Sequence, residues 1–211
     1  SNNTIFGTQY KSFPETGVPL VSDMSSDIFS RTIDFSKFDL IYAGAQKNMG
    51  PAGTTLVIVK KSALGRVNRS IPAMMNYLNH IEAGSMYNTP PVFPVYVSML
   101  TLRWIKNNGG VAAIQKRNEA KADALYDEIE RNPLFYTPTA MEDRSNMNVC
   151  FLLHDKEKEK QFLESCKYAG CIGLEGHRSV GGFRASIYNA MSLEGVNVLI
   201  DVMKDFEKLH G

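Results

Sequence analysis

Cysteine is scarce in this chain of 211 residues, which contains only Cys150, Cys166 and Cys171. The number is odd and no C-x-x-C spacing occurs, which argues against a disulfide framework and against a zinc site, and we expect no bound metal. This cysteine usage indicates a reducing compartment, so the expected location is the cytoplasm.

The chain also lacks long apolar runs and an excess of charge of one sign. Its longest aliphatic run, LVIV, is far too short to cross a bilayer and the N-terminal SNNTIFGTQY is polar, so we expect neither a membrane helix nor a signal peptide. With 23 basic and 22 acidic residues the net charge is +1. No overall field favours nucleic acid or a membrane surface, and partners must therefore be sought at local sites.

The first third of the sequence contains three short apolar runs that are typical of strands. These are Val18 to Asp23, FDLIYAG (residues 38–44) and TTLVIVKK (residues 54–61). Nearly continuous apolar runs that end in polar or small residues predict strands buried on both faces of an α/β sheet.

Helical periodicity dominates after residue 93. Helices are predicted over Pro94 to Lys106, ending at NNGG, and over Val111 to Glu130, ending before Pro133. The remainder predicts a strand (146–155), a helix (157–170), a strand (181–190) and an amphipathic helix from Leu193 to Leu209. We expect an α/β protein with two domains, 1–107 and 108–211, and a hinge at the glycine pair between Lys106 and Val111.

Asp23 is the first candidate site residue, because it ends the apolar run VPLVSD. The carboxyl ends of strands in open α/β sheets are where ligands bind. An aspartate in this position can equally cap the following segment through its side-chain oxygen.

Lys47 is the second candidate site residue, and it lies in the stretch YAGAQKNMGPAG directly after a predicted buried strand. A desolvated amine with a lowered pKa is suited to Schiff-base chemistry, and the surrounding Ala and Gly would let a flat ligand approach the backbone. A lysine in a loop is more commonly a solvated surface residue, and its position alone does not decide between these interpretations.

The third candidate lies in GHRSVGGFRASIYNA. Phe183, Ala185 and Ile187 alternate with polar residues, so Arg184 is predicted to point away from the packing face, where a guanidinium suits a carboxylate. His177 and Arg178 add a cationic pocket suited to phosphate. The alternative is a solvated edge strand whose arginine discourages edge pairing.

Three longer motifs connect these candidates: DLIYAGAQKNMGPAGTTLVIVKK, GSMYNTPPVF and GHRSVGGFRASIYNAM. Together they closely resemble the phosphoserine aminotransferases, fold-type I, class V enzymes that depend on pyridoxal 5′-phosphate, and the resemblance runs over nearly the whole chain. It implies the last part of a large cofactor-binding domain, with a mainly parallel sheet and flanking helices, followed by a smaller α/β domain. It also implies a homodimer that transfers an amino group from glutamate to 3-phosphohydroxypyruvate, giving 2-oxoglutarate and phosphoserine for serine biosynthesis.

The resemblance also implies individual roles. Lys47 would be the catalytic lysine joined to the cofactor aldehyde, and Asp23 the carboxylate that keeps the pyridine nitrogen protonated. The other roles are cofactor contacts for Gln46 and Thr4, contacts to the cofactor phosphate of the neighbouring subunit for Asn88 and Thr89, substrate-phosphate binding for His177 and Arg178, and a carboxylate clamp for Arg184.

The start of the chain departs from the family pattern. Members carry an earlier segment with the turn that holds the cofactor phosphate, a stacking aromatic residue and a substrate arginine, and no G-x-G-x-x-G loop replaces it here. We therefore expect a truncated C-terminal portion that is a poor enzyme alone and self-associates. The alternatives are another fold-type I pyridoxal phosphate enzyme, against which the His177–Arg178 pair argues, and an inactive remnant that only self-associates.

Overall fold

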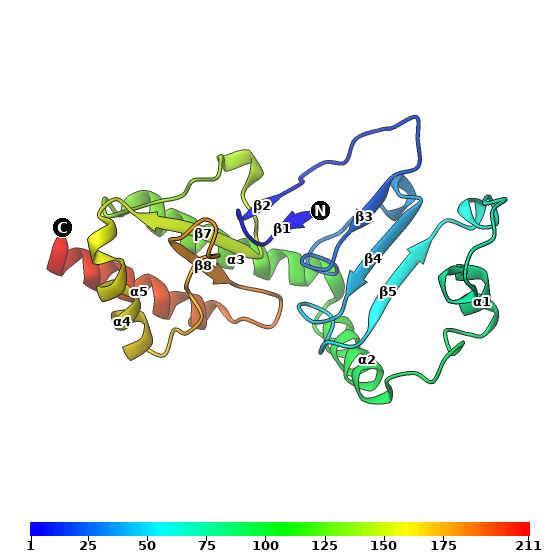
Figure 1. The fold of residues 1–211 in the computed structure, drawn as a ribbon. Helices are drawn as coiled ribbons and strands as arrows, with labels where there is room; N and C mark the ends of the chain where they lie inside the picture. The colour runs from blue at the N-terminus through cyan, green and yellow to red at the C-terminus, as the bar shows by residue number, and fades with distance from the viewer.

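The computed structural model describes residues 1–211 and has an α/β architecture with two regions (Figure 1). The strands are β1 (Asn2–Asn3), β2 (Thr8–Gln9), β3 (Val21–Asp23), β4 (Leu40–Gly44), β5 (Thr55–Val59), β6 (Phe135–Tyr136), β7 (Asn148–Leu153) and β8 (Phe183–Ser186). The α-helices are α1 (Tyr77–Glu82), α2 (Val92–Asn107), α3 (Gly110–Arg131), α4 (Glu159–Tyr168) and α5 (Leu193–His210). None of these helices combines the length and apolar character that a membrane crossing requires.

The first region is built on the sheet β3-β4-β5. β3 runs parallel to β4, and Asp23 lies opposite Tyr42 in their register. β5 runs antiparallel to β4, so that Gly44 lies opposite Thr55. The three predicted strands are confirmed, although the first is shorter than expected, and the sheet is mixed within this chain.

This sheet is buried on one face only. Ile41 and Ala43 of β4 are buried, whereas Tyr42 between them is 40% exposed and Val21 of β3 is 55% exposed. The buried face packs against side chains that follow β3, in a cluster of five buried residues: Met24, Ile28, Phe38, Ile41 and Ala43. The prediction that these strands are buried on both faces is wrong for this chain, because no segment of it covers the opposite face.

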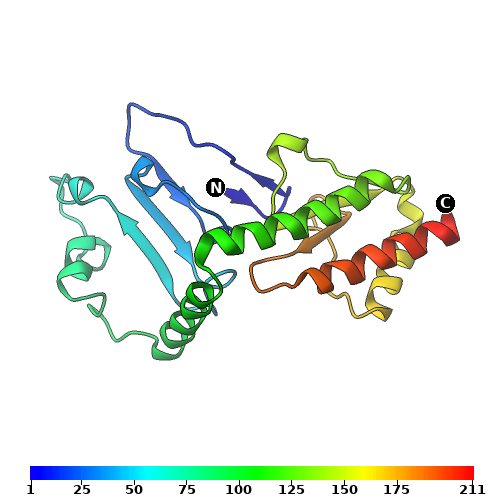
Figure 2. The ribbon, with the colours of Figure 1, turned by 180° about the vertical axis from the view of Figure 1, so that it is seen from behind.

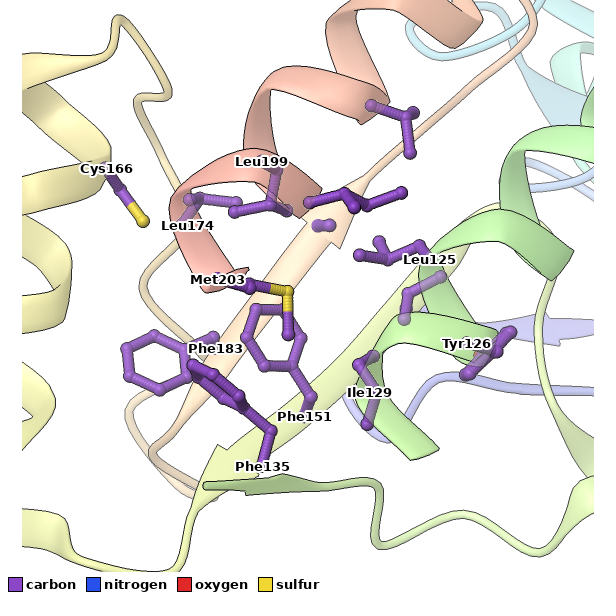
Figure 3. Packing of buried hydrophobic residues seen from close by; sticks show 14 of the residues in the cluster. Leu125, Tyr126, Ile129, Phe135, Phe151, Cys166, Leu174, Phe183, Leu199 and Met203 are labelled. Atoms are coloured by element: carbon purple, nitrogen blue, oxygen red, sulfur yellow. The ribbon is translucent and has the colours of Figure 1, made fainter. Parts of the chain in front are cut away.

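The second region has a larger core. The antiparallel sheet β6-β7-β8 packs with α3, α4 and α5 around a cluster of 19 buried residues. Figure 3 shows the aromatic rings of Phe135, Phe151 and Phe183 close to Met203 of α5. Phe162 of α4 stands edge-on to Phe135 and Phe183, with ring centroids 5.0 and 4.9 Å apart. Offset and edge-on ring contacts of this kind stabilise a core beyond simple area burial.

The long helix α3 links the two regions. It begins after α2 and runs along the second region beside α5, as Figure 2 shows from behind. Gly109 and Gly110 have φ values of 93° and 73°, and this left-handed backbone ends α2 where the sequence predicts a stop. The predicted domain boundary between residues 107 and 108 falls at this turn. The division into two domains remains a prediction. The short elements α1, β1, β2 and β6 were not predicted, because each is too brief to show a period.

Candidate functional site

Lys47 lies in the tight turn that follows β4. The Ala45 N–H donates to Thr54 O at 2.9 Å, and the Gly50 N–H donates back to Ala45 O at 2.8 Å. A Cβ on Gly50 would lie 2.6 Å from the Ser98 hydroxyl oxygen, so only glycine lets α2 pack directly on the turn. The small residues around Lys47 therefore serve close packing of the backbone, which fixes the root of the lysine side chain.

The Lys47 amine is half-buried and sits among charged and aromatic groups. Its Nζ lies 5.7 Å from the centre of the Tyr188 ring, a cation–π distance. Burial lowers the pKa of Lys47 below its ordinary value, the positive charge of Arg184 lowers it further, and the carboxylate of Asp23 opposes both. A larger fraction of this amine is therefore neutral, and nucleophilic, than of a solvated lysine.

Asp23 ends β3 beside the strand that leads to Lys47. Its Oδ1 accepts a hydrogen bond from the Ser25 N–H at 2.7 Å, which is the capping role considered above. The same carboxylate and the Lys47 amine line one open cavity of about 800 Å³. The two interpretations of Asp23 are therefore compatible, because the cap orients a carboxylate whose other oxygen remains free.

The β1–β2 hairpin forms another wall of this cavity. Thr4 lies in its turn and lines the cavity together with Ser25 and Ser26. The Asn2 amide donates to Ser26 Oγ at 3.0 Å and to Asn148 Oδ1 at 3.0 Å, so the hairpin bridges the two regions of the molecule. Figure 1 shows the N-terminus between the two sheets.

Arg184 joins the second region to this hairpin. Its β8 neighbours Phe183 and Ala185 are buried, as the alternation predicts, while Arg184 itself is half-buried on the other face. Its Nη1 donates to Thr4 O at 3.3 Å, and its buried Nε has no partner. β8 is an edge strand, but Arg184 is not a solvated edge residue, because its guanidinium contacts Thr4 and its charge acts on the Lys47 amine.

The other predicted site residues do not line the cavity. Gln46 is exposed beside Lys47. His177 shares a hydrogen bond with the Ser179 hydroxyl at 2.7 Å, and Arg178 is exposed with no acidic partner within 4 Å. Asn88 and Thr89 are both exposed, in the segment between α1 and α2. Lys47, Asp23 and Thr4 line one cavity and Arg184 contacts its wall at Thr4 O, whereas the remaining five residues lie outside it.

Sequence reasoning missed several residues that frame Lys47. Tyr188 donates to Asn148 Oδ1 at 3.3 Å, and burial raises its pKa above the ordinary value. Tyr188 lies on the polar side of the predicted strand that carries Arg184, and this period-two pattern could have identified it. The buried residues Asn48, Asn148 and Asn189 gave no such signal, because an isolated asparagine is typical of turns and caps.

The site contains no metal-binding arrangement. No group of three or more histidine, cysteine, aspartate or glutamate side chains is placed to hold a metal ion. The cavity is lined by the Lys47 amine, the carboxylates of Asp23 and Asp143, hydroxyls and side-chain amides, and the Arg184 guanidinium contacts its wall at Thr4 O.

Lys47 and Asp23 lie at the ends of neighbouring strands, and comparison with known protein families shows which family has this arrangement. The model of the family described as aminotransferase class-V matches residues 6–199, and the chain belongs to this family. More particularly, it is 66% identical over 207 residues to the phosphoserine aminotransferase of Flavobacterium johnsoniae, an alignment that covers 98% of this chain and 58% of that protein.

Solved structures agree with this relationship. Phosphoserine aminotransferase from Bacillus circulans subsp. alkalophilus superposes with a TM-score of 0.96 at 44% identity, over 100% of this chain and 59% of that one. The enzyme from Trichomonas vaginalis, solved with pyridoxal phosphate bound, gives 0.90 at 40% identity, over 96% of this chain and 58% of the other. The predicted fold and family are confirmed, and the chain spans a little under three fifths of the length of these relatives.

Proposed function

We propose that this chain is the lysine-bearing part of a pyridoxal phosphate-dependent transaminase that interconverts 3-phosphohydroxypyruvate and glutamate with phosphoserine and 2-oxoglutarate. The observation that carries the proposal is the placement of Lys47 and Asp23 on one cavity by two adjacent parallel strands. The similarity to phosphoserine aminotransferases, such as the relative at 66% identity, supports the substrate assignment.

The residues present fit the cofactor. An amine with a lowered pKa suits covalent attachment to an aldehyde, and a carboxylate free on one side suits a protonated pyridine nitrogen. The cavity of about 800 Å³ has room for a cofactor and a small amino acid together. When bound, pyridoxal phosphate supplies an electron sink for the substrate α-carbon.

Lys47 then has two tasks in sequence. Its Nζ would hold the cofactor aldehyde, and once an amino substrate had taken that place the free amine would accept the proton from the substrate α-carbon. Burial and the nearby Arg184 lower the pKa of this amine, which keeps more of it in the neutral form that a base requires. The rigid turn after β4 holds the amine in place for the proton transfer.

Anionic groups of the substrate find cationic partners in the second region. Arg184, whose Nη1 donates to Thr4 O at the cavity wall, would supply the guanidinium for the substrate α-carboxylate. His177 and Arg178 would take the phosphate that distinguishes phosphoserine from glutamate. Arg178 has no protein carboxylate to displace, which favours this role.

We further propose that the enzyme is a homodimer of the cytoplasm. The segment that carries Asn88 and Thr89 is flanked by exposed apolar side chains, which include Met86, Val92 and Phe93. An apolar surface of this kind is suited to burial against a second copy, where Asn88 and Thr89 would contact the partner's cofactor. The three cysteines are free thiols, which supports a reducing compartment.

Substrate selectivity tests this function. In the enzyme that contains this segment, Arg178→Ala should reduce amino transfer from phosphoserine about 10- to 100-fold, the cost of one charge-assisted hydrogen bond. Amino transfer from glutamate should change by less than about threefold, because glutamate has no phosphate. Cofactor absorbance after addition of each amino donor measures both half-reactions.

Arg69→Ala is the matched control, since Arg69 is exposed, makes no ion pair and lies outside the cavity. Equal losses with both donors would contradict the phosphate role of Arg178. Wild-type protein that accepts glutamate but not phosphoserine would point instead to another aminotransferase of the same fold.

A further inference from the structure

Lys121 of α3 is an unusual residue for the interior of a protein. It is 2% exposed, and no acidic side chain forms an ion pair with it. Its Nζ donates to Ile187 O at 3.0 Å and to Tyr188 O at 2.9 Å. Burying an unpaired ammonium is costly, and an apolar residue of similar size would fill the space at less cost. Stability of the core therefore does not explain why a lysine is present.

The carbonyls that Lys121 binds belong to the segment that frames Lys47. Tyr188 places its ring 5.7 Å from the Lys47 amine. The Asn189 N–H donates to Asn48 Oδ1 at 3.0 Å, and Asn48 directly follows Lys47. The segment from Ile187 to Asn189 therefore contacts the Lys47 site twice. Tyr188 lies beside Lys47 itself, and Asn189 binds Asn48.

A second contact from α3 acts on the same segment. Asn118, one helical turn before Lys121, donates to Asn189 Oδ1 at 2.8 Å and to Ser30 O at 3.0 Å. Asn189 in turn donates to Phe29 O at 3.0 Å. Where α3 passes the site its buried face carries the polar Asn118 and Lys121. Further along, that face carries Leu125 and Ile129, and the one buried charge there, Glu128, is paired with Arg131.

Lys121 is one of few groups that fix the backbone at Ile187 and Tyr188, where Tyr188 O also accepts a hydrogen bond from the Met191 N–H at 2.9 Å. The Ile187 N–H donates to Met147 O at 2.9 Å, but Lys121 is the only hydrogen-bond partner of Ile187 O. The strand β8 has already ended at Ser186, so no ladder continues to Tyr188. A donor that reaches two successive carbonyls fixes the peptide plane between them, which an apolar side chain cannot do.

From these contacts we propose that Lys121 is a positioning residue of the Lys47 site: by binding the carbonyls of Ile187 and Tyr188 it holds Tyr188 and Asn189 against Lys47 and Asn48. The functional meaning of this proposal rests on the proposed role of Lys47 as the reactive amine. The hydrogen bonds from Lys121 to Ile187 O and Tyr188 O do not depend on that role, and they can be tested without cofactor.

The first test is hydrogen exchange of the chain with Lys121→Met, which keeps the length of the side chain and removes the donor. The amides of Ile187, Asn189 and Met191 should exchange about tenfold faster, as expected for the loss of one or two hydrogen bonds, and so should those of the turn at Asn48. The core strand β7 should be unchanged. Lys208→Met is the control, because Lys208 is exposed on α5.

The second test measures the Lys47 amine directly, by competitive acetylation with acetic anhydride over a range of pH and mapping of the products. Burial is the largest cause of its lowered pKa, the charge of Arg184 lowers it further, and the carboxylate of Asp23 opposes both. When Lys121→Met releases Tyr188, water should reach the amine, so its apparent pKa should rise towards that of exposed lysines. Lys121→Arg retains donors for both carbonyls and should restore the low value.

Each outcome bears on the proposal. Local loosening with a raised apparent pKa at Lys47, and rescue by Lys121→Arg, would support it. Faster exchange spread evenly over all core amides, or an unchanged Lys47 in a folded Lys121→Met protein, would overturn it. If Lys121→Met does not fold, Lys121→Gln replaces it, since a shorter donor cannot reach both carbonyls and should give the same local pattern. Failure of Lys47 to bind pyridoxal phosphate would refute the proposed function and leave these two readouts intact.

Discussion

The two regions of the molecule differ in how completely they bury their own apolar surface. The region of β6, β7 and β8 encloses 19 buried residues between its sheet and helices. The region of β3, β4 and β5 encloses five, and its strands and helices expose Tyr42, Val92, Phe93 and other large apolar side chains. The region of β6, β7 and β8 has the core of an independent folding unit, whereas the region of β3, β4 and β5 has one packed face and one open face. The candidate site lies where these two regions meet.

The largest effect should follow from damage to the larger core. Phe162 is fully buried and contacts four other aromatic rings, those of Phe135, Phe151, Phe183 and Phe206. Phe162→Ala should lower the free energy of unfolding by about 4 kcal/mol, because the cavity cannot close around fixed rings. Urea unfolding followed by circular dichroism measures this, and a loss below about 1 kcal/mol would show that the core is not the stable part of the molecule.

A smaller loss should follow from the corresponding change in the smaller core. Ile41→Ala removes a buried side chain from a cluster of five, and should cost about 2 to 3 kcal/mol. Since Ile41 precedes the Lys47 turn by a few residues, protection of the turn amides should fall while β7 keeps its protection. Hydrogen exchange distinguishes the two regions, and equal loss of protection in both would mean that they unfold as one unit.

The pH dependence of stability should reveal the buried lysine at the junction. Burial lowers the pKa of Lys121 to about 8, against 10.5 in the unfolded chain. Between these values the unfolded state binds a proton that the folded state does not, so this lysine adds stability as the pH rises from 8 to 10.5 and none as it falls below 8. The gain should be of the order of 2 kcal/mol, after allowance for screening by solvent.

Subtraction isolates that contribution. The unfolding free energy of wild type minus that of Lys121→Met should increase between pH 8 and 10, because the lysines and tyrosines other than Lys47 and Tyr188 titrate alike in both proteins. A difference that stays constant over this range would mean that Lys121 titrates as a solvated amine and that its ammonium is not desolvated.

Local pattern predicted most of the fold, and its failures have physical causes. Period and stop signals located the helices α2, α3 and α5 to within about two residues, because the glycine pair after Asn108 and the amphipathic faces are encoded locally. The burial of β3 and β4 on both faces was wrong, because an apolar run does not say which segment covers its second face. Tyr42 is exposed because no segment of this chain packs on that face.

The candidate site was predictable to a similar extent. Strand ends indicated Asp23 and Lys47, and alternation along residues 183–187 indicated the orientation of Arg184, whose contact with Thr4 spans 180 positions of the sequence. Lys121 and Asn189 could not be found in this way. The sequence of an amphipathic helix predicts that a lysine is solvated. Only the packing of α3 against the segment after β8 shows that Lys121 is buried.

Covalent capture of the cofactor tests the role of Lys47 most directly. The protein is incubated with pyridoxal phosphate, reduced with borohydride, digested and mapped by mass spectrometry, with Lys47→Arg as the matched variant. The lowered pKa of this amine and its cavity beside Asp23 predict that the pyridoxyl mass falls on Lys47 and disappears in Lys47→Arg. Label distributed over exposed lysines, and equal in both proteins, would contradict the assignment of this site.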